Sequence, residues 1–105
     1  MSKEVGYLDN EETRDLKQIA EVFLLINVVS GKEDSVARKL MRVPEIRKVH
    51  TVLGGYDLIA VMEVERGFIK PAADKVAEIL KAKVRKIAGI SHTETLIPIS
   101  SKVKD

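Results

Sequence analysis

Apolar residues cluster along the chain in four segments that predict β-strands. The first segment is rich in β-branched and aromatic side chains and is apolar in both of its alternating sets. The third shares this character, whereas the second and fourth carry many charged and hydroxyl side chains. The four predicted strands are residues 21–29, 46–53, 56–64 and 90–99.

Two segments between these strands show the three- and four-residue spacing of amphipathic helices. The first covers about residues 33–42, where four apolar side chains share one face before Pro44 prevents continuation. The second begins at Pro71, which suits a first helical turn. Gly89 is expected to cap the C-terminal end of this second helix.

The resulting order of elements, strand-helix-strand-strand-helix-strand, predicts a ferredoxin-like α+β fold. Right-handed crossovers place both helices on one face of a four-stranded antiparallel sheet with strand order 4-1-3-2. The first and third strands are then central, which agrees with their apolar character on both faces. Pro98 is tolerated because the fourth strand is an edge. Gly54 and Gly55 are interpreted as a two-residue turn between the second and third strands.

Two helices can cover only one face of this sheet. The apolar side chains on the other face of the central strands therefore need a second cover. Exposed apolar patches beyond roughly 300–600 Å² are rare on monomers. We expect another subunit to supply the cover, which predicts a sheet-facing dimer or a higher even-numbered homo-oligomer.

The composition excludes several classes of protein but does not indicate a specific function. The 105 residues suit one domain, and the absence of cysteine excludes a disulfide framework and thiolate metal ligands. No run reaches the about 18 apolar residues of a membrane span. The first residues also lack the apolar core of a secretory signal. The expectation is a cytoplasmic protein without membrane contact.

The charge balance gives a weak signal. A net charge of +2 is too small to argue for nucleic-acid binding, and no groove-reading helix is predicted, so we expect no direct specific DNA binding. Residues 70–86 hold six basic side chains against two acidic ones. This stretch is interpreted as a solvated helix face, with a docking surface for an acidic partner as the alternative.

Residues that commonly carry catalysis or bind metals are few. The only histidines, His50 and His92, fall on opposite edge strands roughly 14 Å apart, so one subunit cannot use both for one metal. No nucleophilic triad, phosphate-binding loop or zinc-protease motif is supported. We therefore predict no catalytic residue, no metal site, no cofactor and no enzyme activity. The alternative is an enzyme of the dimeric α+β-barrel type, for which the central strands offer only Asn27 and Asp57.

The segment Gly54-Gly55-Tyr56-Asp57 is the strongest candidate for binding. Glycine N–H groups at a hairpin can approach a carboxylate, and Asp57 can accept from an ammonium group. This pairing suits a zwitterion such as an amino acid. The alternative is structural: glycines for the turn, a tyrosine for packing, and a solvated aspartate at the start of a strand.

Residues 21–99 resemble the effector-binding domain of the Lrp/AsnC (feast/famine) transcription regulators, also called the RAM domain. The resemblance begins with the hydrophobic strand and helix, and includes Pro44-Glu45 and the Gly-x-Tyr-Asp hairpin. It continues through residues 87–99, with a glycine-hydrophobic step and a Thr-x-Thr strand.

The resemblance implies dimers whose sheets face each other, assembly of dimers into rings, and amino-acid effectors bound between subunits near the hairpin. Carried over by position, the effector-binding residues would be Gly54, Gly55, Tyr56 and Asp57, with Thr93 and Thr95 as contributors. Many members have an acidic residue where this chain has Gly55. That departure leaves open how the amino group of an effector would be recognised.

Full-length members also carry an N-terminal helix-turn-helix domain, for which residues 1–20 are too few. We expect an N-terminal arm or short helix in residues 1–20, an effector-binding domain in 21–100 and a polar tail in 101–105. The predicted function is a non-enzymatic regulatory module that binds an amino acid or similar effector at an oligomer interface. It would modulate full-length Lrp/AsnC regulators or a metabolic enzyme. The alternatives are the dimeric α+β-barrel enzyme and a purely structural oligomerisation domain.

Overall fold

The computed structural model of the chain describes residues 19–65 and 72–104. The predicted N-terminal arm, apart from its last two residues, and Pro71 lie outside these described residues. Within them the chain alternates strands and helices in the predicted order. The elements are β1 (Ile19–Val28), α2 (Glu33–Leu40), β2 (Ile46–Thr51), β3 (Leu58–Glu65), α3 (Ala72–Ile79), η1 (Leu80–Val84) and β4 (Ile90–Leu96).

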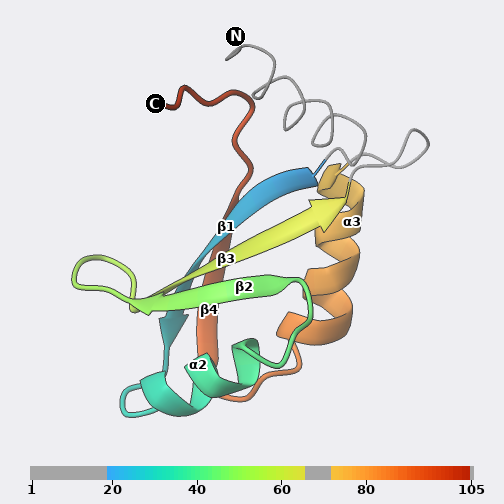
Figure 1. Cartoon of the computed structure of the whole chain (residues 1–105). Coiled ribbons are helices and arrows are strands. Elements are labelled where there is room, and N and C mark those ends of the chain that lie inside the picture. The colour runs from blue at the N-terminus through green and yellow to red at the C-terminus, as the bar shows by residue number, and fades with distance from the viewer. Residues whose placement is uncertain (1–18, 66–71, 105) are drawn as a thin grey trace, which may run out of the picture.

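The four strands form one antiparallel sheet with the order β2-β3-β1-β4, which confirms the predicted topology (Figure 1). The central strands pair along eight positions, from Ile19 opposite Glu65 to Ile26 opposite Leu58. Both edge strands pair with a local irregularity, between Ile46 and Lys48 in β2 and at the end of β1 where it meets β4. The fold is the predicted ferredoxin-like α+β arrangement.

The core lies between one face of the sheet and the helices. Every second residue of β1 and β3 faces this layer and is buried, as the period of two in a strand requires. The helices contribute Val36 and Leu40 from α2, Val76 from α3 and Val84 from η1. The buried strand residues of this layer are Val22, Leu24, Ile26, Val28, Leu58, Ala60, Met62 and Val64.

The helices differ from the prediction at their ends. Helix α2 ends at Leu40, where the Val43 N–H donates to the Leu40 carbonyl and turns the chain. Helix α3 continues into the π-helical turn η1, in which Arg85 N–H donates to the carbonyl of Leu80. The prediction that Gly89 caps this helix is wrong, because η1 ends at Val84.

Gly89 instead allows the loop before β4 to approach α2 and the residue after β1 closely. Its backbone has a φ of 102°, and its carbonyl accepts from the Val29 N–H at 2.7 Å. A Cβ at this position would lie 2.9 Å from Cγ2 of Val36 in α2. A side chain here would therefore push the loop before β4 away from α2.

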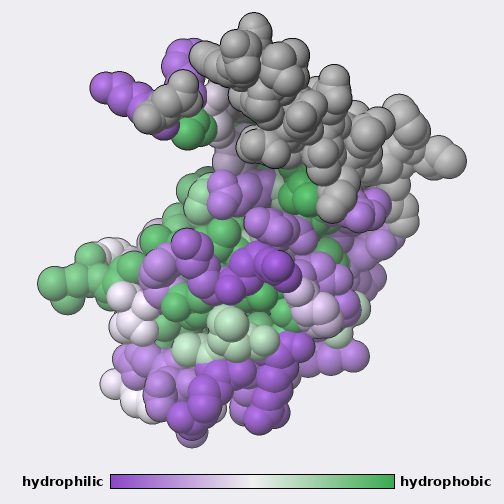
Figure 2. All heavy atoms as spheres, in the orientation of Figure 1, coloured by the Kyte–Doolittle hydropathy of each residue, from purple (hydrophilic) through white to green (hydrophobic). Residues whose placement is uncertain are grey.

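The connection between β2 and β3 is longer than predicted. Six residues, 52–57, separate Thr51 from Leu58, so the interpretation as a two-residue turn is wrong. The Val52 N–H donates to the Asp57 carbonyl and closes the base of this loop, and of its two glycines only Gly54 has a positive φ, 152°. The loop projects from the sheet with hydrophobic residues at its end, where Leu53 is fully exposed (Figures 1 and 2).

Candidate functional site

The face of the sheet opposite the helices is open in the described chain and carries apolar side chains at its centre. Phe23 and Leu25 of β1 and Ile59 of β3 are half-buried there, and Val61 of β3 is already buried among its neighbours. Leu96 of β4 extends this surface to an edge, at 47% exposure. We call this surface the open face; it consists of Phe23, Leu25, Ile59, Val61 and Leu96 with the polar side chains that flank them. Its apolar centre is the feature that the sequence predicted.

Tyr56 reaches from the β2–β3 loop to the far edge of the sheet. Its hydroxyl donates a hydrogen bond to Oε1 of Glu94 on β4. Its ring stacks on His92, with centroids 6.4 Å apart and planes inclined by 22°. Because β1 lies between β3 and β4, Tyr56 bridges over the end of β1 and ties the loop to the opposite edge strand.

The hydrogen bond to Glu94 raises the pKa of the Tyr56 hydroxyl above its ordinary value of 10.0, with smaller contributions from burial and from the charge of Glu94. The phenol therefore remains a neutral donor at physiological pH. Glu94 and His92 were not among the sequence-predicted site residues. They are two residues apart in β4, and this spacing places both side chains on the same face of a strand. That spacing was the only sign in the sequence that they could act together.

Asp57 does not have the solvated position that was the structural alternative for it. Its Oδ2 accepts a hydrogen bond of 2.9 Å from the partly buried N–H of Val28. Its own N–H donates to the carbonyl of Ile26 at 2.9 Å. This carboxylate therefore holds the end of β1 at the point where the pairing of β1 with β4 becomes irregular.

Gly54 and Gly55 lie at the exposed tip of the loop. A Cβ built on either residue would meet no heavy atom within 4 Å, so their backbone can be approached from outside. Only Gly54 needs glycine for its backbone angle. At Gly55 the structure shows no local reason for the absence of a side chain.

Thr93 and Thr95 do not share the surface of Tyr56. They pair with Ile26 and Leu24 of β1, whose side chains face the helices, whereas Glu94 faces the open side. Thr93 lines a cleft of about 280 Å³ at the start of β4, and Thr95 is not among the residues that line it. The cleft is formed by Arg85, Ile90, Ser91, His92 and Thr93.

This cleft is rich in hydrogen-bond donors and has no acidic residue in its lining. Arg85 offers a guanidinium group, and Ser91 and Thr93 offer hydroxyls. His92 belongs both to the cleft and to the stack with Tyr56, so the cleft and the loop are contiguous. The sequence marks Arg85 only as one of the basic residues of the stretch 70–86 and does not predict that it lines a cleft.

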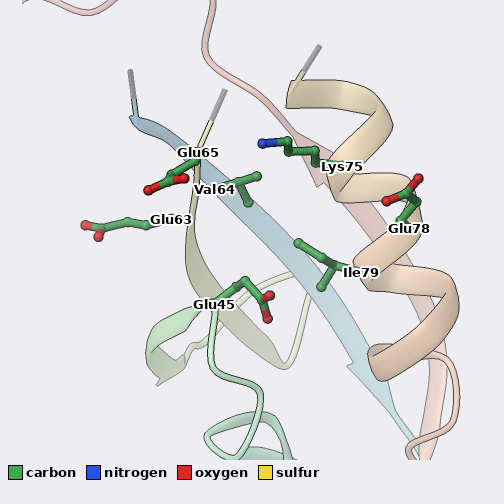
Figure 3. A pocket seen from close by; sticks show the side chains of 7 residues that line it. All are labelled: Glu45, Glu63, Val64, Glu65, Lys75, Glu78 and Ile79. Carbon is green, nitrogen blue, oxygen red and sulfur yellow. The ribbon is translucent and has the colours of Figure 1, made fainter. Parts of the chain in front are cut away.

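A second cleft, of about 440 Å³, lies between β3 and α3 and is lined mainly by carboxylates (Figure 3). Glu45 pairs with Lys83 at 3.0 Å, and Glu63 pairs with Arg47 at 3.6 Å. Figure 3 shows Glu63 and Glu65 pointing away from α3. Across residues 19–65 and 72–104, no group of three potential ligands could hold a metal ion. No helix in the same part of the chain is long and apolar enough to span a membrane.

Residues 21–105 match the family model of the Lrp/AsnC ligand binding domain. The chain belongs to this family. The family match begins at Glu21, the third residue of β1, and therefore includes the β2–β3 loop, the open face and the cleft beside β4.

A relative of known type is a transcription regulator. The HTH-type transcriptional regulator FL11 of Pyrococcus furiosus is 32% identical over 75 residues, which are 71% of this chain and 45% of FL11. This chain therefore spans less than half the length of that regulator.

Solved structures agree with the fold. Hypothetical protein PHS023 from Pyrococcus horikoshii is 30% identical, with a TM-score of 0.64 over 78% of this chain and 92% of that one. A feast or famine regulatory protein from M. tuberculosis, complexed with L-methionine, is 17% identical, with a TM-score of 0.64 over 89% of this chain and 58% of that one. The latter likeness establishes the shared fold alone.

Proposed function

We propose that this chain is a non-enzymatic sensing module that binds an amino acid or a similar small zwitterion and passes the signal through its own oligomer. The observation that carries the proposal is the match of the Lrp/AsnC ligand binding domain over residues 21–105. The methionine complex of the M. tuberculosis protein supports an amino acid as the class of ligand.

The residues near the β2–β3 loop offer suitable partners for both ends of a zwitterion. One oxygen of Asp57 accepts from Val28, which leaves the other oxygen to accept from an ammonium group. The unhindered backbone of Gly54 and Gly55, or Arg85 with Thr93 in the contiguous cleft, can donate to a carboxylate. Tyr56 links these two parts through its contacts with Glu94 and His92. Thr95 has no contact that supports a role beside them.

The open face supports assembly into a homo-oligomer. Its centre is apolar, and a hydrophobic surface of this kind is stabilised when a second subunit removes it from water. The proposed assembly is an even-numbered homo-oligomer. Full-length regulators of the same family are proposed as further partners.

A thermal-shift screen over the twenty amino acids tests the proposal. A ligand present at a hundred times its dissociation constant should add about 2.7 kcal/mol of stability. In a domain of this size each kcal/mol corresponds to roughly 4–8 °C in melting temperature. For every amino acid that binds, the amine lacking its carboxylate and the acid lacking its amino group serve as matched controls, and both should bind more weakly. If no amino acid shifts the melting temperature, the sensing role is wrong and the structural oligomerisation domain becomes the better interpretation.

A further inference from the structure

The cleft beside β4 lies at the outer edge of the sheet. Two of its lining residues, His92 and Thr93, are neighbours in the strand, so their side chains point to opposite faces. A cleft that both residues line therefore lies at the edge of the sheet and not on one of its faces. In the described chain β4 is the last strand of the order β2-β3-β1-β4, so no strand lies on its outer side. The backbone of β4 is thus open to a ligand in this cleft.

Hydrogen bonds elsewhere in the sheet determine which N–H groups of β4 point outward. Paired residues of two antiparallel strands direct their N–H and C=O groups either toward each other or away from each other. The Ile26 carbonyl accepts from Asp57 on the β3 side, so its partner Thr93 directs its own N–H away from β1. Val28 likewise donates to Asp57, so its partner Ile90 also directs its N–H outward. Two residues that line the cleft therefore offer backbone donors at this edge.

The strand is irregular between these two donors. Ser91 has no partner in β1, because consecutive residues of β1 pair with His92 and Ile90. β4 therefore has one residue more than β1 over this stretch, which is the arrangement of a β-bulge. Bulges are frequent beside binding sites because they redirect a side chain and bend the strand. Ser91 itself lines the cleft and adds a hydroxyl group between the two outward N–H groups.

The surroundings of the cleft favour a negatively charged ligand. Residues 79–93 contain four lysine and arginine side chains and neither aspartate nor glutamate. Within residues 19–65 and 72–104, Arg85 makes no ion pair, whereas Lys83 is paired with Glu45. The next carboxylate along β4, that of Glu94, accepts from Tyr56 on the open face. The guanidinium group of Arg85 is therefore available to a ligand.

We propose that this cleft binds a tetrahedral oxyanion, namely a phosphate ion or the terminal phosphate of a small metabolite. The donors are the guanidinium of Arg85, the hydroxyls of Ser91 and Thr93, and the outward N–H groups of β4. Arginine binds phosphate through paired hydrogen bonds, and backbone N–H groups in a concave surface also bind anions. Donors that approach from several directions suit the tetrahedral oxygens of phosphate better than the two coplanar oxygens of a carboxylate.

The size of the cleft agrees with a small anion. Its volume of about 280 Å³ lies just below the roughly 300–1,000 Å³ of pockets that enclose drug-sized ligands. A phosphate group fits inside, and the remainder of a larger metabolite would extend into solvent. This inference goes beyond the proposed function, in which the cleft is one of two places for the carboxylate of a zwitterion. Phosphate needs no partner for an ammonium group, so its binding does not depend on the charge of Asp57.

A titration of the full chain with inorganic phosphate, followed through its amide NMR signals, tests the proposal. Sodium chloride holds the ionic strength constant, because screening of surface charges changes with salt. Phosphate should shift the signals of Ile90, Ser91 and Thr93 until they saturate, and sodium chloride alone should not. If phosphate leaves these signals in place, or if chloride shifts them equally, the cleft is not an oxyanion site.

Two variants of one turn distinguish a site from a general effect of charge. Arg85→Gln and Lys86→Gln each remove one exposed positive charge, but only Arg85 lines the cleft. Arg85→Gln should weaken phosphate binding about ten- to a hundred-fold, as the loss of a hydrogen bond to a charged group implies, and Lys86→Gln should change it little. Arg85→Lys keeps the charge without the planar group and should recover only part of the affinity. Equal weakening by the two glutamine variants would overturn the proposal.

A phosphate monoester, glycerol phosphate, distinguishes the two sources of the anion. Tighter binding than that of inorganic phosphate identifies the terminal phosphate of a metabolite as the ligand, and weaker binding identifies the free ion. Asp57→Asn should leave the affinity for phosphate unchanged in either case. If amino acids raise the melting temperature but phosphate shifts no signal of β4, the sensing role stands and the oxyanion site is wrong. If phosphate binds and no amino acid does, the oxyanion site stands and the sensing role is wrong.

Discussion

Replacing Asp57 by alanine tests whether the loop aspartate has a structural role. The variant loses the 2.9 Å hydrogen bond from the Val28 N–H to Oδ2 and leaves that N–H, partly buried at the end of β1, without its protein acceptor. A hydrogen bond to a charged group contributes about 1.5–3 kcal/mol. For a domain of about 100 residues this corresponds to a fall of roughly 6–24 °C in melting temperature.

The free energy of unfolding should be measured by urea titration, followed by circular dichroism and extrapolated linearly to water. Protein concentration must be held constant, because stability depends on it in an oligomer. Asp34→Ala is the matched control. It removes an aspartate that forms an exposed ion pair with Arg38, worth about 0.3–0.5 kcal/mol.

The expected result is that Asp57→Ala destabilises the protein by at least 1 kcal/mol more than Asp34→Ala does. Equal losses in the two variants would refute the structural role. They would mean that water replaces Asp57 as the acceptor for the Val28 N–H with no loss of folding free energy. Asp57 would then behave as the solvated aspartate of the structural alternative.

Three further changes probe other parts of the structure. Gly89→Ala should cost about 1–3 kcal/mol more in urea unfolding than Gly31→Ala, because both positions have positive φ but only Gly89 approaches Val36 closely. The raised pKa of Tyr56 means that the stabilisation from its neutral hydroxyl persists below pH 10.0 and is lost as the pH rises through the folded-state pKa. In an ultraviolet titration, Glu94→Gln should lower that pKa. Arg85→Gln should weaken binding of any amino acid found in the screen about ten-fold, whereas Lys86→Gln should not.

The order of the elements could be predicted because the apolar pattern has different periods in strands and helices. The β2–β3 connection could not be predicted in the same way. Leu53 was assigned to a strand because it is apolar, yet it is fully exposed in the projecting loop. Hydrophobic character alone cannot distinguish a strand residue from one that projects from a loop. The π-helical turn η1 was missed because its apolar residues keep the spacing of an α-helix.

Only the loop residues of the candidate site could be predicted from the sequence, and not the residues that they contact. Tyr56 and Asp57 were identified from their local motif, but their partners lie 38 and 29 residues away in the sequence. No local pattern links Tyr56 to Glu94 or Asp57 to the backbone of Val28. Thr93 was expected beside the hairpin, whereas the register places it on the helix-facing side. Predicting a strand gives the alternation of its side chains but not which set faces which layer.

The two roles of Asp57 can be separated with Asp57→Asn. The side-chain oxygen of asparagine can still accept from the Val28 N–H, so this variant should recover most of the stability that Asp57→Ala loses. It lacks the negative charge, however, and should bind an amino-acid effector about ten-fold more weakly if the second oxygen of Asp57 accepts from the ammonium group. Calorimetry on a ligand from the screen measures this affinity. Unchanged affinity in a stable Asp57→Asn protein would place the ammonium site elsewhere and leave Asp57 with its bond to Val28 alone.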